Sequence, residues 1–173
     1  MNVRRAEPED ADAIAQVHLA SWKTTYPGII PQAYIDGLRV DDGAARWKVR
    51  LSEKLPTVLV AEDDAGIFGF AAGGRPLHPV EGFDAELHAI YLLASHHGKG
   101  AGRGLVRRLA EILVQQGFTS LVAWALTENL ACGFYQRLGG VRVAEQTIEI
   151  GGKRLPEVAF GWRDLQRLCA KRE

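Results

Sequence analysis

A glycine-rich turn between an apolar run and an amphipathic run constrains this chain more than any other feature. Glycines stand at positions 98, 100, 102 and 104, after the strand-like run 87–93 and before the helix-like run 105–116. The first N–H groups of a helix have no partners within it, and they lie at the positive end of the helix dipole. Glycines let a phosphate approach those N–H groups closely. The stretch 91–105 therefore predicts a site for a phosphate-bearing cofactor.

The runs on either side of this turn predict a mixed α/β sheet. Hairpins are predicted where β-type runs flank short turns, over 57–72 and over 141–160. Helices are predicted where apolar residues recur at spacings of three and four. The predicted helices cover about 8–21, 31–38, 41 to near Lys54, 105–116 and 130–138. With strands over 85–93 and 121–126, the order of elements predicts one domain over residues 1–173, ending in a polar tail over about 164–173.

The charge balance and the hydropathy pattern argue against several partners. Lysine plus arginine (21) equals aspartate plus glutamate (21), so no net charge favours nucleic acid or an anionic membrane. No apolar run approaches the length of about 18 residues that a membrane span needs. The two cysteines, Cys132 and Cys169, form neither a disulfide framework nor a zinc-ligand spacing, and we expect no metal site. The N-terminal sequence has no apolar segment typical of a signal peptide. We expect a cytoplasmic protein.

The strand before the glycine turn carries two polar side chains that could act in acid–base chemistry. Strict alternation would place Glu86, His88, Ile90 and Leu92 on one face of the strand, provided that no bulge intervenes. An acid and an imidazole on an otherwise apolar strand are candidates for proton transfer. The alternative is an exposed face or an edge of the sheet.

Three large aromatic residues lie in or beside an irregular segment that follows the first predicted helix. Trp22, Tyr26 and Tyr34 flank the turn at Pro27-Gly28. They could form the wall of a substrate pocket. Packing between two helices is the alternative, because most aromatic side chains simply bury apolar area.

Two well-known phosphate-binding motifs do not match the glycine turn. In the dinucleotide fingerprint the sixth position is glycine, but here it is Arg103 when counted from Gly98 and Leu105 when counted from Gly100. The P-loop requires serine or threonine after its lysine, whereas Lys99 precedes Gly100. A nucleotide-binding enzyme of the Rossmann type is therefore disfavoured.

A third motif does resemble this turn. The segment from His97 to Gly102, His-Gly-Lys-Gly-Ala-Gly, resembles the pyrophosphate loop [Q/R]-x-x-G-x-[G/A] of GNAT-superfamily N-acetyltransferases, with histidine in place of glutamine or arginine. The segment from Asn129 to Gly140 is similar to the superfamily segment N-x-x-A-x-x-F-Y-x-x-x-G-F, and departs from it at Cys132 and Gly140. The resemblance covers nearly the whole chain.

The resemblance implies a single-domain α/β fold. Its central sheet would be mixed, mostly antiparallel and of about seven strands, with helices on both sides. The strand ending near Leu92 and the strand around Trp124 would splay apart and hold acetyl-CoA. The residues implied in binding it are Ile90, Tyr91, Leu92, His97, Gly98, Lys99, Gly100, Ala101, Gly102, Arg103, Asn129 and Tyr135.

The activity implied by the resemblance is transfer of an acetyl group from acetyl-CoA to a primary amine by direct attack. Tyr135 matches the tyrosine that protonates the leaving thiolate, although it could also be a core ring. Glu86, acting through water, is our first choice for the base that deprotonates the amine, and His88 is the second. The acceptor could be a small molecule or a peptide, and a homodimer is compatible with the resemblance. The main alternative is a CoA-binding sensor or a degenerate homologue without transferase activity.

Overall fold

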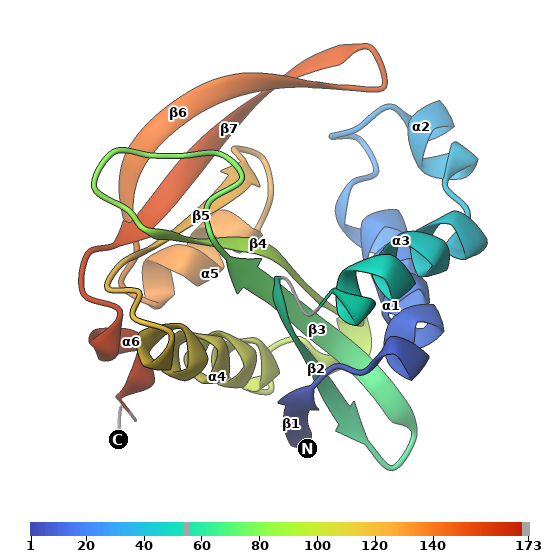
Figure 1. Ribbon diagram of the computed structural model, residues 1–173. Coiled ribbons are helices and arrows are strands. Elements are labelled where there is room, and N and C mark those ends of the chain that lie inside the picture. The colour runs from blue at the N-terminus through green and yellow to red at the C-terminus, as the bar shows by residue number, and fades with distance from the viewer. Residues whose placement is uncertain (54–55, 171–173) are drawn as a thin grey trace.

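The computed structural model describes residues 1–53 and 56–170, and within them seven strands form one sheet (Figure 1). The strand order is β1-β2-β3-β4-β5-β7-β6. Only β4 and β5 pair in parallel, and the other neighbouring strands are antiparallel. The strands are β1 (Asn2–Arg5), β2 (Thr57–Asp63), β3 (Gly66–Gly74), β4 (Ala85–Leu92), β5 (Leu121–Leu126), β6 (Val141–Ile150) and β7 (Lys153–Trp162). The predicted fold class is confirmed.

Helices cover both faces of the sheet, with α1 and α3 on one side and α4 on the other (Figure 1). The helices are α1 (Ala11–Thr25), α2 (Gln32–Gly37), α3 (Val40–Ser52), α4 (Ala101–Gln115), α5 (Ala131–Arg137) and α6 (Gln166–Cys169), with short 3₁₀ turns over Pro8–Asp10 and Ala94–His96. Lys54, near which α3 was predicted to end, lies outside the described residues. So do residues 171–173 of the predicted tail, whose earlier part contains α6.

Two apolar clusters hold the helices against the sheet. On one face, Leu105 and Leu109 of α4 pack in a fully buried cluster with Leu87 of β4. On the other face, Ile14 of α1 and Trp47 of α3 share a second cluster with residues of β2 and β3. Each helix thus buries its apolar stripe against the sheet, as the spacing of three and four predicts.

The sheet opens between β4 and β5. Their parallel pairing runs only from Ala85 opposite Leu121 to Leu87 opposite Ala123. Beyond this point β4 continues along β3 as far as Leu92, while β5 continues along β7 as far as Leu126. The two strands therefore diverge towards their carboxyl ends, which confirms the predicted splay.

A β-bulge in β4 changes which side chains share a face. Ala72 and Gly73 of β3 are adjacent, yet they lie opposite Ala89 and Leu87, so His88 is an extra residue in the ladder. As a result Leu87, Ile90 and Leu92 all belong to the cluster under α4. Glu86 therefore does not share a face with Ile90 and Leu92. The shared face was expected only for a strand without a bulge, and that condition is not met, because the bulge inverts the alternation after His88.

The β6–β7 hairpin arches away from the sheet and ends beside α2 (Figure 1). At its tip, a Cβ atom built on Gly151 would lie only 2.9 Å from Cβ of Tyr34. Next to it, Nζ of Lys153 donates a hydrogen bond to the carbonyl of Ile29 at 2.9 Å. The hairpin thus contacts the segment that joins α1 to α2, next to the opening between β4 and β5.

Candidate functional site

The glycine turn leads directly into α4 through two residues with positive φ. Gly98 has φ of 74° and Gly100, which precedes the first helical residue Ala101, has φ of 84°. Other L-residues adopt this left-handed conformation only with strain. A Cβ atom built on either glycine meets no atom within 4 Å, so the space over the turn is open. Glycine is needed at both positions for the backbone conformation.

The main-chain N–H groups of the turn are free to bind a ligand. The main-chain N–H groups from Gly98 to Arg103 donate no hydrogen bond to any described residue. The first N–H group of α4 that does so is that of Gly104, which donates to the carbonyl of Gly100 at 3.0 Å. These groups lie at the positive end of the dipole of α4. Lys99 and Arg103 are exposed, and neither forms an ion pair with another described residue. The turn fits a diphosphate.

Two histidines hold the turn in place. Nε2 of His97 donates a hydrogen bond to the carbonyl of Leu92 at 3.0 Å, and Oγ of Ser21 donates to the same oxygen at 3.1 Å. The ring of His96 stacks on Phe68 with centroids 3.9 Å apart, and its Nε2 lies 3.1 Å from Oδ2 of Asp63. His97 therefore ties the turn to the end of β4, although it stands where the superfamily has glutamine or arginine. The role of His96 was missed, because its partners are remote in the sequence.

The main-chain groups of Ile90 and Leu92 face the opening of the sheet. The N–H of Leu93 donates to the carbonyl of Phe68 at 2.8 Å, so Leu93 faces β3. Main-chain groups alternate along an antiparallel strand, so those of Tyr91 also face β3, whereas those of Ile90 and Leu92 face the other edge. On that edge β5 has already diverged. The Leu92 carbonyl is occupied by Ser21 and His97, which leaves the Ile90 groups and the Leu92 N–H for a ligand.

Tyr135 lies on α5 and belongs to the apolar cluster on the α4 face, against which Ile90 and Leu92 of β4 also pack. Its side chain is 5% exposed and packs against Phe160 and Trp162, with centroid separations of 5.7 and 5.9 Å. Its hydroxyl makes no hydrogen bond with any described residue, and burial raises the pKa of Tyr135 above its ordinary value. The phenol therefore keeps its proton at neutral pH, the state that a general acid requires.

Asn129 connects α5 with α1 and β4. Its Oδ1 accepts a hydrogen bond at 2.9 Å from the N–H of Ala131, the first residue of α5. Its Nδ2 donates to the hydroxyl of Tyr26 at 3.2 Å, and that hydroxyl lies 3.4 Å from the hydroxyl of Tyr91. Burial raises the pKa of Tyr26. Predicted cofactor and acceptor residues thus meet in one polar network.

The three aromatic residues proposed for the acceptor are close together. The ring of Trp22 lies 4.8 Å from that of Tyr26 and 6.2 Å from that of Tyr34, measured between centroids. Tyr26 is buried, whereas Tyr34 is 41% exposed. Leu126 and Leu155 complete this apolar cluster from β5 and β7. The group borders the opening of the sheet on the face away from α4.

Glu86 and His88 both contact the segment that joins β3 to β4. Oε2 of Glu86 accepts hydrogen bonds from the N–H groups of Leu77 and His78, both at 2.8 Å, and Oε1 lies 3.2 Å from Nδ1 of His78. The Glu86 side chain is almost completely buried. Nε2 of His88 donates to the carbonyl of Arg75 at 2.9 Å. Burial lowers the pKa of His88, so the ring is neutral at pH 7 and its Nδ1 carries a lone pair.

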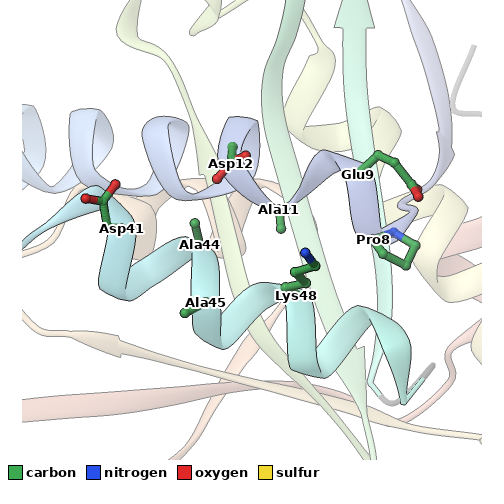
Figure 2. Close-up of a pocket in the computed structure, with 8 residues that line it drawn as sticks. All are labelled: Pro8, Glu9, Ala11, Asp12, Asp41, Ala44, Ala45 and Lys48. Carbon is green, nitrogen blue, oxygen red and sulfur yellow. The ribbon is translucent and has the colours of Figure 1, made fainter.

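Two surface hollows have different surroundings. One, of about 360 Å³, lies between the start of α1 and α3, where Figure 2 shows the side chain of Lys48 rising from α3 towards Ala11 at the start of α1. It contains none of the predicted site residues. The other, of about 630 Å³, lies against Trp124 of β5 and Gln146 of β6, beneath the loop 79–82. This second hollow adjoins the face on which Glu86 and the three aromatic residues lie.

The family assignment rests on a match over most of the chain. The profile of the Acetyltransferase (GNAT) family matches residues 19–140, which include the turn, the opening between β4 and β5, and α5. The chain belongs to the GNAT acetyltransferase family. This confirms the enzyme class implied by the resemblance, an acetyltransferase that uses acetyl-CoA as its acyl donor.

Several characterised and uncharacterised relatives share this sequence pattern. An uncharacterized N-acetyltransferase, YuaI of Bacillus subtilis, is 45% identical over 97% of this chain and 96% of its own. The L-amino acid N-acyltransferase MnaT of Escherichia coli is 31% identical over 95% of this chain and 90% of its own. An L-methionine sulfoximine/L-methionine sulfone acetyltransferase of Pseudomonas paraeruginosa is 36% identical over 62% of this chain and 60% of its own.

Solved structures share the fold. The putative acetyltransferase yncA of Salmonella typhimurium, solved with acetyl-CoA, superposes with a TM-score of 0.71 at 24% identity, covering 95% of this chain and 94% of that one. The PaiA N-acetyltransferase of Thermoplasma acidophilum, solved with coenzyme A, gives a TM-score of 0.65 at 22% identity, covering 90% and 96%. Within residues 1–53 and 56–170, no helix has the length and apolar character that a membrane crossing requires.

Proposed function

We propose that this protein transfers the acetyl group of acetyl-CoA to a primary amine by direct attack of the amine on the thioester. The observation that carries the proposal is the run of free N–H groups from Gly98 to Arg103, next to the opening of the sheet at Ile90. A diphosphate at the turn and an extended arm in the opening would both find unpaired main-chain partners there. Lys99 and Arg103 would bind the ribose phosphate.

Acetyl-CoA supplies an activated acyl group as a thioester. The N–H groups of Ile90 and Leu92 point to the edge of β4 where the sheet opens, and one of them would donate to the thioester carbonyl. Donors fixed in advance at a developing oxyanion stabilise the transition state by about 3–4 kcal/mol. The splayed strands make this possible, because in a closed sheet β5 would occupy these donors.

The base that removes a proton from the amine is the second part of the proposal. Both oxygens of Glu86 already accept hydrogen bonds from the β3–β4 segment, which favours an anchoring role for this carboxylate. His88 is neutral, and when its Nε2 donates to the Arg75 carbonyl its Nδ1 has no partner among the described residues. The contacts therefore favour His88 as the base, through water, over our first choice Glu86. Tyr135 would then protonate the leaving thiolate.

The acceptor is proposed to be a small-molecule amine, with L-amino acids as the first class to test. The relatives named for activity act on L-amino acids and on L-methionine sulfoximine or sulfone. Trp22 and Tyr34 would form part of the pocket wall, on the face away from α4. A peptide amine is the alternative acceptor.

A thiol-release assay tests this function. The protein is mixed with acetyl-CoA and a panel of L-amino acids, alkylamines, polyamines, aminoglycosides and peptides, and free CoA is measured with a thiol reagent. We expect release that depends on the amine. Calorimetric binding of acetyl-CoA without release by any member of the panel would instead support a CoA-binding sensor.

A further inference from the structure

Glu157 is a buried carboxylate that the chemistry described above does not use. It lies in β7, where it pairs with Leu126 of β5 on one side and Gln146 of β6 on the other. Its side chain is only 9% exposed. A buried carboxylate normally has a cation or several donors as partners, since its desolvation is otherwise uncompensated.

The partners that Glu157 has do not neutralise it. Nε2 of Gln146 donates a hydrogen bond to Oε1. Oε2 has no hydrogen bond with any described residue, and no lysine, arginine or histidine in residues 1–53 and 56–170 forms an ion pair with Glu157. Oε2 is not among the side-chain atoms that are closed to solvent and lack a partner, so it can be reached from outside. The carboxylate is therefore available for a cation from outside the chain.

The face that carries Glu157 is the face on which the acceptor is proposed to bind. Leu155 and Ala159, two residues before and after it, pack on the side away from α4. Val158 and Phe160 pack on the side of α4. Because side chains alternate along a strand, Glu157 points away from α4, between the cluster around Tyr26 and the cluster around Trp124.

The surroundings of Glu157 suit an organic cation. Trp124 is its diagonal neighbour on β5, pairs with Ala159, and is only half-buried. Trp124 and Gln146 both line the hollow of about 630 Å³, a volume within the range of small-molecule sites. A carboxylate beside an aromatic ring is a combination that recognises ammonium groups. Glu157 itself does not line the hollow, but its hydrogen-bond partner Gln146 does, so a small molecule in the hollow would lie next to this part of the face.

The position of Glu157 separates it from the reacting nitrogen. The thioester would be held by β4, and β7 lies two strands away, about 10 Å in a paired sheet and more where β4 and β5 diverge. The attacking nitrogen must lie within about 3.5 Å of the thioester carbon. We propose that Glu157 binds a second, non-reacting cationic group of the acceptor, so that amines carrying such a group, the basic L-amino acids and diamines among them, are the preferred substrates. This inference rests on the proposed function.

Matched pairs of amines test the assignment. Putrescine is compared with butylamine, and cadaverine with pentylamine, so that each pair differs by one terminal ammonium group. With the wild-type protein we expect kcat/KM in the thiol-release assay to be at least about tenfold higher for each diamine. In Glu157→Gln, which keeps the shape and can still pair with Gln146, the KM for the diamines rises about tenfold and that preference disappears.

Glu145→Gln is the matched control. Glu145 is exposed, lies on the same hairpin, and pairs with Val158 on the opposite face. The Glu145→Gln variant removes the same charge as Glu157→Gln, but from the other face of the hairpin. We therefore expect its preference for diamines to equal that of the wild type. The wild-type comparison stands even if a variant fails to fold, and melting temperatures identify such a failure.

The outcomes separate this inference from the proposed function. Equal kcat/KM for diamines and monoamines in the wild type, or a preference that persists in a folded Glu157→Gln protein, overturns the role of Glu157 alone. Absence of release with every amine, although acetyl-CoA binds, overturns the proposed transfer and the role of Glu157 with it.

Discussion

His18 gives the protein a pH-dependent stability whose size can be worked out. It lies on α1 with its ring against those of Tyr91, Trp22 and Phe70, at centroid distances of 4.7, 5.7 and 5.8 Å. Burial, with smaller contributions from the charges of Arg46 and Arg50, lowers its pKa from 6.5 to about 4. The folded protein therefore holds this ring neutral.

The sign follows from the protons bound by each state. Between pH 6.5 and 4 the unfolded chain protonates His18 and the folded chain does not, so the free energy of unfolding falls as the pH falls. Relative to a pH well above 6.5, where the ring is neutral in both states, the loss is about 1.4 kcal/mol at pH 5.5 and about 2.6 kcal/mol at pH 4.5, with a limit of about 3.4 kcal/mol. Above the unfolded pKa the stability from this group is complete.

Urea unfolding of the wild type and of His18→Leu, followed by circular dichroism over that pH range, measures the effect. Other acidic and basic groups contribute equally to both proteins, so the difference between the two pH profiles isolates His18. We expect the variant to lose about 2.6 kcal/mol less than the wild type between pH 7.5 and 4.5. Parallel profiles would refute the buried, neutral state of this ring.

Three further predictions concern the site. Tyr135→Phe should lower kcat by at least about tenfold with little change in the KM for acetyl-CoA, and unchanged turnover would remove its acid role. His88→Gln should remove the enzyme's contribution to the fall of kcat/KM at acidic pH and leave only the fall due to protonation of the amine, whereas Glu86→Gln should lower the melting temperature. Loss of the enzyme's contribution in the Glu86 variant alone would reverse our choice of base. Gly102→Val should displace Phe134, whose ring lies 3.3 Å from a Cβ built there, and calorimetry should show weaker CoA binding; full affinity would contradict this.

The glycine turn at the start of α4 could be predicted because it depends on residues that are close together in the sequence. The positive φ values of Gly98 and Gly100 and the start of α4 depend on residues next to one another in the chain. The same holds for the β6–β7 hairpin, where Gly151-Gly152 forms the turn. Such features follow from backbone preferences that tertiary contacts do not override.

Features that depend on remote partners could not be read in this way. The bulge at His88 is defined by the pairing of β4 with β3, and no residue type within β4 predicts it. The donors to Glu86 come from the N–H groups of Leu77 and His78, in a loop whose path the sequence does not reveal. Nothing in the sequence singles out Glu157, because its position depends on the strand order, which places β7 between β5 and β6.

The central claim is that the turn at the start of α4 binds CoA through its main-chain N–H groups, and calorimetric titration with CoA tests it most directly. We compare the wild type with Gly100→Val and with the control Gly117→Val. Both glycines have positive φ, 84° and 92°, and lie at opposite ends of α4 with no atom within 4 Å of a built Cβ. We predict that only Gly100→Val abolishes binding. Binding that persists in Gly100→Val, or is lost equally in both variants, would contradict the claim.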